Sequence, residues 1–121
     1  MNEIAKVTPS HSVILVMVRL AGVIPSSMSG ALVASTPSCV AVGILSEHDG
    51  ETTITITDED ADLSVGLPVF DGVILTPSRV VSVCSALDDV LLVASVPAET
   101  SRIRVFVNHP MEPDLITIRV S

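Results

Sequence analysis

The residues best suited to chemistry in this chain are carboxylates gathered in one stretch. Between Leu20 and Ser78 there is no lysine or arginine, and eight acids fall within residues 47–71. The rest of the chain holds six acids and six bases, so the whole formal net charge of −8 belongs to this stretch. Seven of these carboxylates are candidate contacts for a partner: Glu47, Asp49, Glu51, Asp58, Glu59, Asp60 and Asp62.

Three hypotheses account for this acidic segment. It can be a solvated turn region that keeps a valine-rich protein in solution. It can be a docking face for a basic protein, because clustered charge speeds association and orients the partner. It can also be a calcium site, since Asp58, Asp60 and Asp62 alternate as the oxygen ligands of calcium loops do. Leu63 and Val69 stand where an EF-hand requires glycine and a bidentate glutamate, so an EF-hand is excluded.

No group of residues in the sequence has the spacing of a known catalytic motif. The chain contains no GxSxG, no HExxH and no glycine-rich phosphate loop. The histidines His11, His48 and His109 fall in predicted turns or at strand ends, where an exposed histidine is ordinary. Enzymes that act on sugars hold them on aromatic side chains, and only Phe70 and Phe106 are available. We expect a protein that is not an enzyme and needs no cofactor.

Two cysteines and one apolar run bear on the cellular compartment. Cys39 and Cys84 lie in valine-rich stretches and are predicted to be buried fillers of the core, although a bridge between them or a metal site stays open. The run Val13–Ile24 is interrupted by Arg19 and is too short to span a bilayer. It also makes a poor signal peptide. The sequence therefore predicts a cytoplasmic protein without a membrane segment.

Composition limits the class of protein further. At 121 residues and 48% apolar, the chain has the size and hydrophobicity of one domain, predicted to span residues 1–121. There is no tryptophan, tyrosine or glutamine, and there is a single lysine. Without a basic patch and interleaved aromatic residues, the chain does not resemble a nucleic-acid-binding protein.

The elements that must position these residues are short strands. Apolar bursts rich in valine alternate with Pro, Gly, Ser and Asp, and no stretch keeps a helical apolar period. This pattern predicts an all-β fold, most simply an antiparallel β-sandwich, with a small β-barrel as the alternative. The predicted strands are residues 13–20, 31–34, 39–45, 52–57, 63–69, 73–75, 80–84, 90–96, 102–107 and 115–120.

Three of these strands carry finer predictions. Residues 13–20 and 90–96 are nearly continuous apolar runs and are expected to be buried on both faces. Residues 52–57 alternate, which places Ile54 and Ile56 on one face and the threonines on the other.

Near the C-terminus, alternation in residues 102–107 and 115–120 turns one set of side chains inward. It turns Arg102, Arg104 and Phe106 outward, together with Arg119 from the second strand. The arginines then share a face. They form either cross-strand ion pairs with acids or a small anion-binding patch.

The C-terminal third resembles small bacterial β-sandwich proteins related to competence protein J, the inhibitor of a DNA-entry nuclease. The similar parts are Val96-Pro97, a short turn over 98–101, an Arg-bearing strand over 102–107, a loop over 108–114 and a last strand over 115–120. The chain has Glu99 and Ser101 where that ending would have a glycine and an aromatic residue. The resemblance implies a β-sandwich and an inhibitory or immunity-type role, and it transfers no functional residue.

The sequence thus favours a small acidic binding protein, an inhibitor or immunity-type protein that docks a basic toxin or nuclease through the acidic segment. One alternative is a structural or assembly subunit of a phage or secretion machine that pairs through a strand edge. Another is a calcium- or carbohydrate-binding β-module. Neither the partner nor the oligomeric state can be assigned from the sequence.

Overall fold

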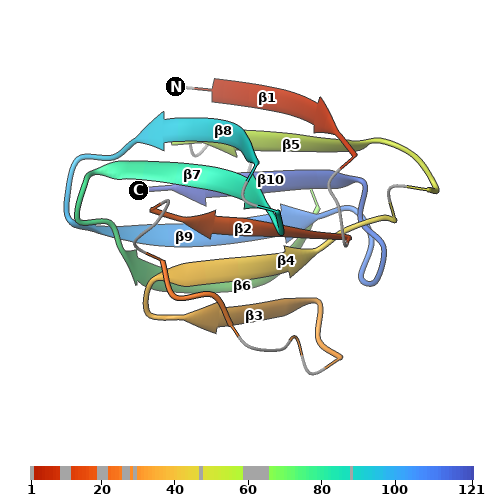
Figure 1. The fold of residues 1–121 in the computed structure, drawn as a ribbon, viewed down its shortest axis with the longest axis horizontal. Helices are drawn as coiled ribbons and strands as arrows, with labels where there is room; N and C mark the ends of the chain where they lie inside the picture. The colour runs from red at the N-terminus through yellow and green to blue at the C-terminus, as the bar shows by residue number, and fades with distance from the viewer. Residues whose placement is uncertain are drawn as a thin grey trace.

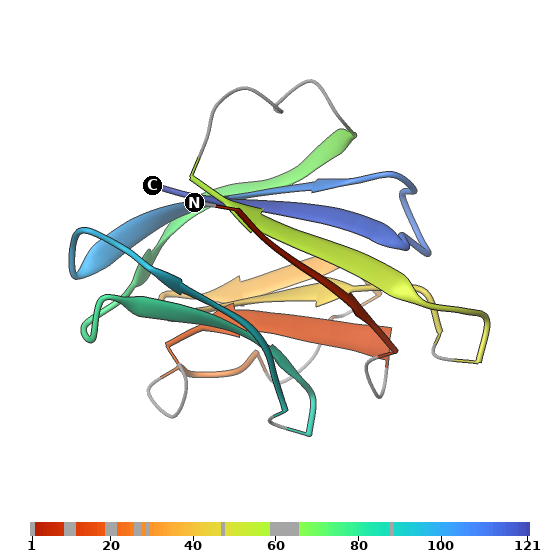
Figure 2. The same ribbon diagram turned by 90° about the horizontal axis from the view of Figure 1, so that it is seen from above.

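The computed structural model describes residues 2–8, 12–18, 22–25, 28, 30–46, 48–58, 66–87 and 89–121. Ten strands in these residues form two five-stranded sheets that pack face to face (Figures 1 and 2). The predicted β-sandwich is therefore confirmed, and the two sheets do not close into a barrel. No helix among the described residues has the length and apolarity that crossing a bilayer would require.

The chain crosses between the two sheets four times: β2–β4 and β7–β8 belong to one sheet, and β1, β5–β6 and β9–β10 belong to the other. Sheet A has the order β1-β5-β10-β9-β6, and sheet B has the order β3-β4-β2-β7-β8. The strands of sheet A are β1 (Asn2–Val7), β5 (Thr52–Thr57), β10 (Leu115–Val120), β9 (Thr100–Val107) and β6 (Leu67–Leu75). Those of sheet B are β3 (Val33–Thr36), β4 (Cys39–Gly43), β2 (Val13–Met17), β7 (Val80–Ser85) and β8 (Val90–Ser95).

Strand β10 lies at the centre of sheet A. It pairs antiparallel with β9, so that Ile118 faces Val105, and parallel with β5, so that Ile118 also neighbours Ile56. The parallel β5–β10 pair departs from the expected antiparallel sandwich. Every other strand pair in the two sheets is antiparallel, as expected. The middle of sheet A therefore depends on the last strand of the chain.

The main core lies between the sheets and consists of alternate residues from their inner faces. In β5, Ile54 and Ile56 are fully buried while Thr53 and Thr55 are half-buried, as the alternation predicted. Thr52 departs from the prediction, because it lies on the isoleucine face and is fully buried, and Thr57 is buried as well. β2 is also buried on both faces, as predicted: Ile14 and Val16 join this core, and its other side chains face the outer side of sheet B.

A second, smaller apolar cluster covers the outer face of sheet B. It consists of Leu15, Met17, Cys39, Ala41 and Cys84, with Val13 and Met28 packed against it. Both cysteines are fully buried and neither forms a disulfide, as the filler hypothesis predicted. Strand β2 lies between the cysteine-bearing strands β4 and β7, so a bridge would have to cross two strand spacings, roughly 10 Å, which is beyond disulfide reach.

The buried thiols should be unreactive in the folded protein. Burial, assisted by the neighbouring Cys84, raises the pKa of Cys39 from 9.0 to about 11. We expect a thiol reagent at pH 8 to label the cysteines only in denaturant. Because folding favours the neutral thiol, this contribution to stability is complete below the ordinary thiol pKa and is lost as pH rises towards about 11. Rapid labelling of the native protein would contradict the buried cluster.

Three predictions about strands and facing side chains were wrong in detail. Residues 90–96 are not buried on both faces: β8 is an edge strand whose Val90 and Val93 are exposed. Residues 63–69 and 73–75 were expected as two strands, but β6 runs unbroken from Leu67 to Leu75 with a bulge after Pro68. Phe106 and Arg119 lie on the outer face of sheet A as predicted, yet both are buried rather than open to solvent.

Candidate partner-binding site

The structure separates the predicted acidic residues that it describes. Asp49 and Glu51 precede β5, whereas Asp58 follows it, and all three are exposed. Six residues of extended strand place Asp58 roughly 20 Å from the other two. Glu47, Glu59, Asp60 and Asp62 lie outside the described residues. The acidic segment is therefore not one continuous patch across the residues that can be compared.

Two further carboxylates come from the β9–β10 loop. The Leu45 N–H donates to the Pro113 carbonyl over 2.9 Å, and the Thr53 N–H donates to the Asp114 carbonyl over 2.8 Å. These bonds tie the β4–β5 link to the β9–β10 loop, which places exposed Glu112 and Asp114 at the end of the sandwich where β5 begins. We define the acidic end as Asp49, Glu51, Glu112 and Asp114.

Local hydrogen bonds fix the β9–β10 loop. The Asn108 side chain donates to Asp114 Oδ1 over 2.6 Å and accepts from the N–H groups of Asp114 and Leu115. The Nδ1 atom of His109 accepts from the N–H groups of Met111 and Glu112 over 3.1 and 3.0 Å. Both side chains act as turn residues do, so the loop presents its carboxylates from a braced backbone.

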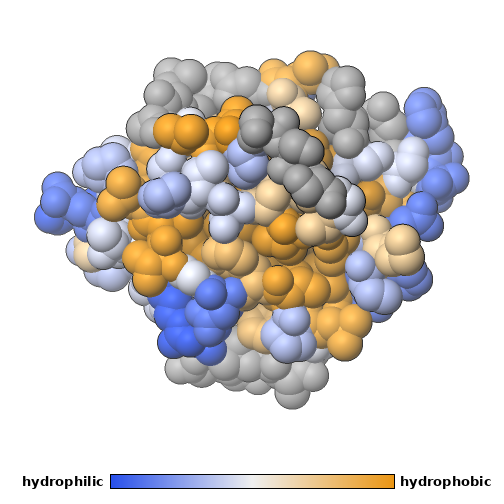
Figure 3. Space-filling view, turned by 90° about the horizontal axis from the view of Figure 1, so that it is seen from below, coloured by the Kyte–Doolittle hydropathy of each residue, from blue (hydrophilic) through white to orange (hydrophobic). Residues whose placement is uncertain are grey.

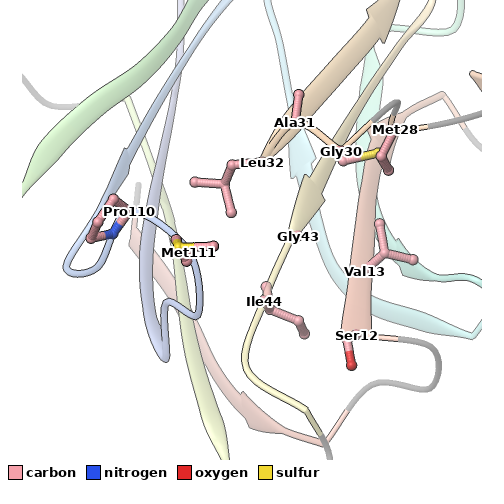
Figure 4. Close-up of a pocket in the computed structure, with 10 residues that line it drawn as sticks. All are labelled: Ser12, Val13, Met28, Gly30, Ala31, Leu32, Gly43, Ile44, Pro110 and Met111. Atoms are coloured by element: carbon pink, nitrogen blue, oxygen red, sulfur yellow. The ribbon is translucent and has the colours of Figure 1, made fainter.

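An apolar pocket opens beside the acidic end (Figure 4). It has a volume of about 330 Å³, and its walls come from the same two regions: Ile44 and Gly43 at the end of β4, and Pro110 and Met111 in the β9–β10 loop. The other lining residues are Ser12, Val13, Met28, Gly30, Ala31 and Leu32. Met111 is 76% exposed at its rim. Such a pocket can take one large side chain of a partner, the usual form of an interface anchor.

The arginines lie toward the opposite end of the sandwich. Arg104 and Arg119 face each other across β9 and β10, which confirms their predicted common face, and Arg102 is two residues away. Both oxygens of Asp71 accept from the Arg102 guanidinium, over 2.8 and 2.6 Å. These two hydrogen bonds lower the pKa of Asp71 from its ordinary value. For Arg102, the ion-pair hypothesis is therefore confirmed.

The Asp71–Arg102 pair should give a small acid-side change in stability. Because the pKa of Asp71 is depressed by folding, the pair stabilises the protein at neutral pH, and its contribution is lost as pH falls through the folded pKa, below about pH 4. Both side chains are half exposed, so we expect a modest effect. Thermal melts between about pH 3 and 6, the range in which carboxyl groups titrate, should show a shallower dependence of melting temperature on pH in Asp71→Asn than in the parent chain.

Sequence reasoning could not have found Glu112 and Asp114 as parts of the site. They lie about forty positions after the end of the acidic segment, in the remainder of the chain, whose six acids and six bases balance. Only the contact between the two loops brings them beside Asp49 and Glu51. No sequence pattern indicated the pocket either, because its lining residues are scattered along the chain.

The metal hypothesis is not decided by the described residues. Among them, no three His, Cys, Asp or Glu side chains come together as metal ligands would. Asp60 and Asp62 of the calcium hypothesis lie outside the described residues, so calcium binding stays a prediction. It would raise the melting temperature in millimolar calcium and lower it with chelator.

Comparisons with known proteins show the fold. No family model matches the chain, and no curated protein matches its sequence. Among solved structures, ComJ of Bacillus subtilis, the inhibitor of the DNA degrading activity of NucA, superposes with a TM-score of 0.71. The superposition covers 98% of this chain and 93% of that one, at 8% sequence identity. The product of crocagin biosynthetic gene J superposes with a TM-score of 0.51 over 98% of this chain and 97% of that chain, at 15% identity.

The likeness to ComJ extends over nearly the whole chain rather than the C-terminal third in which the sequence suggested it. At 8% identity it is a likeness of fold, and it identifies no shared site residue. A similar fold is thus found in a protein described as the inhibitor of the DNA degrading activity of NucA.

Proposed function

We propose that this chain is a non-enzymatic inhibitor or immunity-type protein that docks a basic protein, such as a nuclease or toxin, through its acidic end. The observation that carries the proposal is the convergence of four exposed carboxylates with an apolar pocket at one end of the sandwich. Enzymes that cleave nucleic acid present a positive cleft to their substrate, and negative charge around an anchoring pocket complements it.

Two other observations support the proposal. ComJ, whose fold this chain shares, inhibits the DNA degrading activity of another protein. Cys39 and Cys84 form no disulfide, which is compatible with the reducing cytoplasm that we propose as the protein's location.

The proposal is tested by affinity capture with two variants of equal net charge. Asp49→Asn with Glu112→Gln removes two of the four carboxylates of the acidic end, one from each loop. Glu3→Gln with Glu99→Gln removes the same charge from exposed positions outside it. At low salt, we expect the parent chain and the second variant to capture the same basic protein, and the acidic-end variant to associate with it about tenfold more slowly.

The captured protein must also be inhibited. Its DNA- or RNA-degrading activity, or its toxicity, should fall on addition of the parent chain and recover at high salt, since screening weakens charge-driven association. Equal capture by the two variants would return the acidic residues to a role in solubility. Capture without inhibition would leave a binding protein and reject the inhibitor.

A further inference from the structure

The free edge of sheet A is the feature that carries a further inference. β6 is nine residues long and, among the described strands, pairs with β9 alone, so its other side is an edge of the described sheet. The facing edge of sheet B is β3, which has only four residues and cannot cover β6 along its length. Figure 3, which views this side of the sandwich, shows hydrophobic residues across its middle and hydrophilic residues toward both ends.

The direction of the main-chain groups in β6 follows from its last residues. The Thr76 N–H donates to Glu99, on the β9 side, and the Leu75 N–H donates to Pro37, on the other side. Because main-chain groups alternate along a strand, the N–H and C=O groups of Asp71 and Val73 also point to the free edge. No strand among the described residues pairs with them.

The β6 edge is blocked at both ends. Pro68 and the bulge that follows it block pairing over the first residues, and the edge-facing Leu75 N–H is already bonded to the turn that follows β3. Between them the strand is regular. The Asp71 charge is already matched by Arg102, and the apolar Val73 side chain is 61% exposed. A strand can therefore add to the short stretch of edge from Asp71 to Val73.

We propose that β6 pairs antiparallel with β6 of a second copy of this chain, so that the two A sheets become one continuous sheet. In the register that centres the two-fold axis on Gly72, Asp71 of each copy lies opposite Val73 of the other. All four outward groups of each copy then have partners, and the two Asp71 carboxylates avoid each other. Gly72 places no side chain at the axis, and the Phe70 ring fills the space beside its Cα.

Charge complementarity selects a second copy in this orientation. β6 begins at the acidic end and ends near Arg79, because β5, β10 and β6 all run the same way. Antiparallel pairing therefore directs the two acidic ends away from each other. It sets the acidic end of each copy near the opposite end of its neighbour, where four arginines (Arg79, Arg102, Arg104 and Arg119) offset Asp58, Asp71 and Glu99. A parallel pairing of two chains with net charge −8 would instead bring the acidic ends together.

Two variants at one position test the pairing. Val73→Pro removes an N–H that the β9 ladder does not use, whereas Val73→Thr keeps the N–H and shortens only the apolar contact. By sedimentation equilibrium we expect the parent chain to dimerise, Val73→Thr to do so with similar affinity, and Val73→Pro to weaken the dimer at least roughly tenfold. Circular dichroism verifies that each variant is folded.

A cross-linking arm keeps the proposal falsifiable where Val73→Pro fails to fold. Asp71→Cys and Val73→Cys proteins, mixed under mild oxidation, should form a disulfide-linked heterodimer more readily than either forms a homodimer. A parent chain that stays monomeric at a few hundred micromolar would overturn the proposal, as would a folded Val73→Pro that dimerises like the parent. None of these results depends on whether the acidic end binds a partner.

Discussion

Replacement of Ile118 by alanine is expected to destabilise the protein by about 2–5 kcal/mol, the largest stability effect of any single change considered. Ile118 is fully buried in the central strand of sheet A, between Ile56 on one neighbour and Val105 on the other. A cavity at this point cannot be closed from the sides, since both neighbouring strands are held in register. Because a domain of this size has about 5–15 kcal/mol in total, the loss is a large share of its stability.

Urea denaturation followed by circular dichroism measures this effect. The matched control is Ile4→Ala in β1, where the side chain is 63% exposed and the free energy of unfolding should change by less than about 0.5 kcal/mol. Similar losses in the two variants would mean that sheet A does not centre on β10. A smaller loss in Ile118→Ala than in the control would mean the same.

Replacement of Ala31 by tryptophan is expected to weaken binding of the captured partner about a hundredfold. Ala31 is exposed and lines the pocket beside the acidic end, so an indole there would occupy the space that a partner side chain needs. Anchor pockets of this kind carry a large part of the energy of an interface. Charge at the rim mainly affects the association rate, so this change should raise the dissociation rate.

Ala98→Trp is the control for that experiment, because Ala98 is exposed in the turn between β8 and β9, at the other end of the sandwich. Binding kinetics of both variants, measured by surface plasmon resonance, separate the pocket from the charges. If Ala31→Trp binds as tightly as Ala98→Trp, the pocket is not an anchor. The proposed docking would then depend on the carboxylates alone.

Alternation in the sequence was sufficient to predict the strands whose two faces differ. The Thr-Ile repeat of β5 and the Arg-bearing strand β9 show period-2 patterns, and both were placed with their buried faces correct. The pattern was weaker where Gly and Pro interrupt it. The region of β6 was therefore predicted as two strands, although Gly72 and Pro68 lie within one strand. An edge strand tolerates Pro68 because its N–H side need not pair.

The arrangement of the strands was not accessible from local patterns. The continuous apolar run of β8 suggested burial on both faces, but its position at the edge of sheet B depends on strands elsewhere in the chain. The pairing of β5 with β10 joins residues about sixty apart, and no local pattern indicates it. For the same reason, only part of the acidic end was predicted. Asp49 and Glu51 were candidates, but the contact that brings Glu112 of the β9–β10 loop beside them was not predicted.

The central position of β10 constrains how this protein can be made. Sheet A is in two parts, β1-β5 and β9-β6, until β10 enters between them, and β10 is the last strand in chain order. While the chain is being synthesised, the inner faces of both parts carry isoleucine and valine with open strand edges beside them, the kind of surface that aggregates. A chain truncated before Leu115 would lack the strand that joins the two parts of sheet A and could not complete the sandwich.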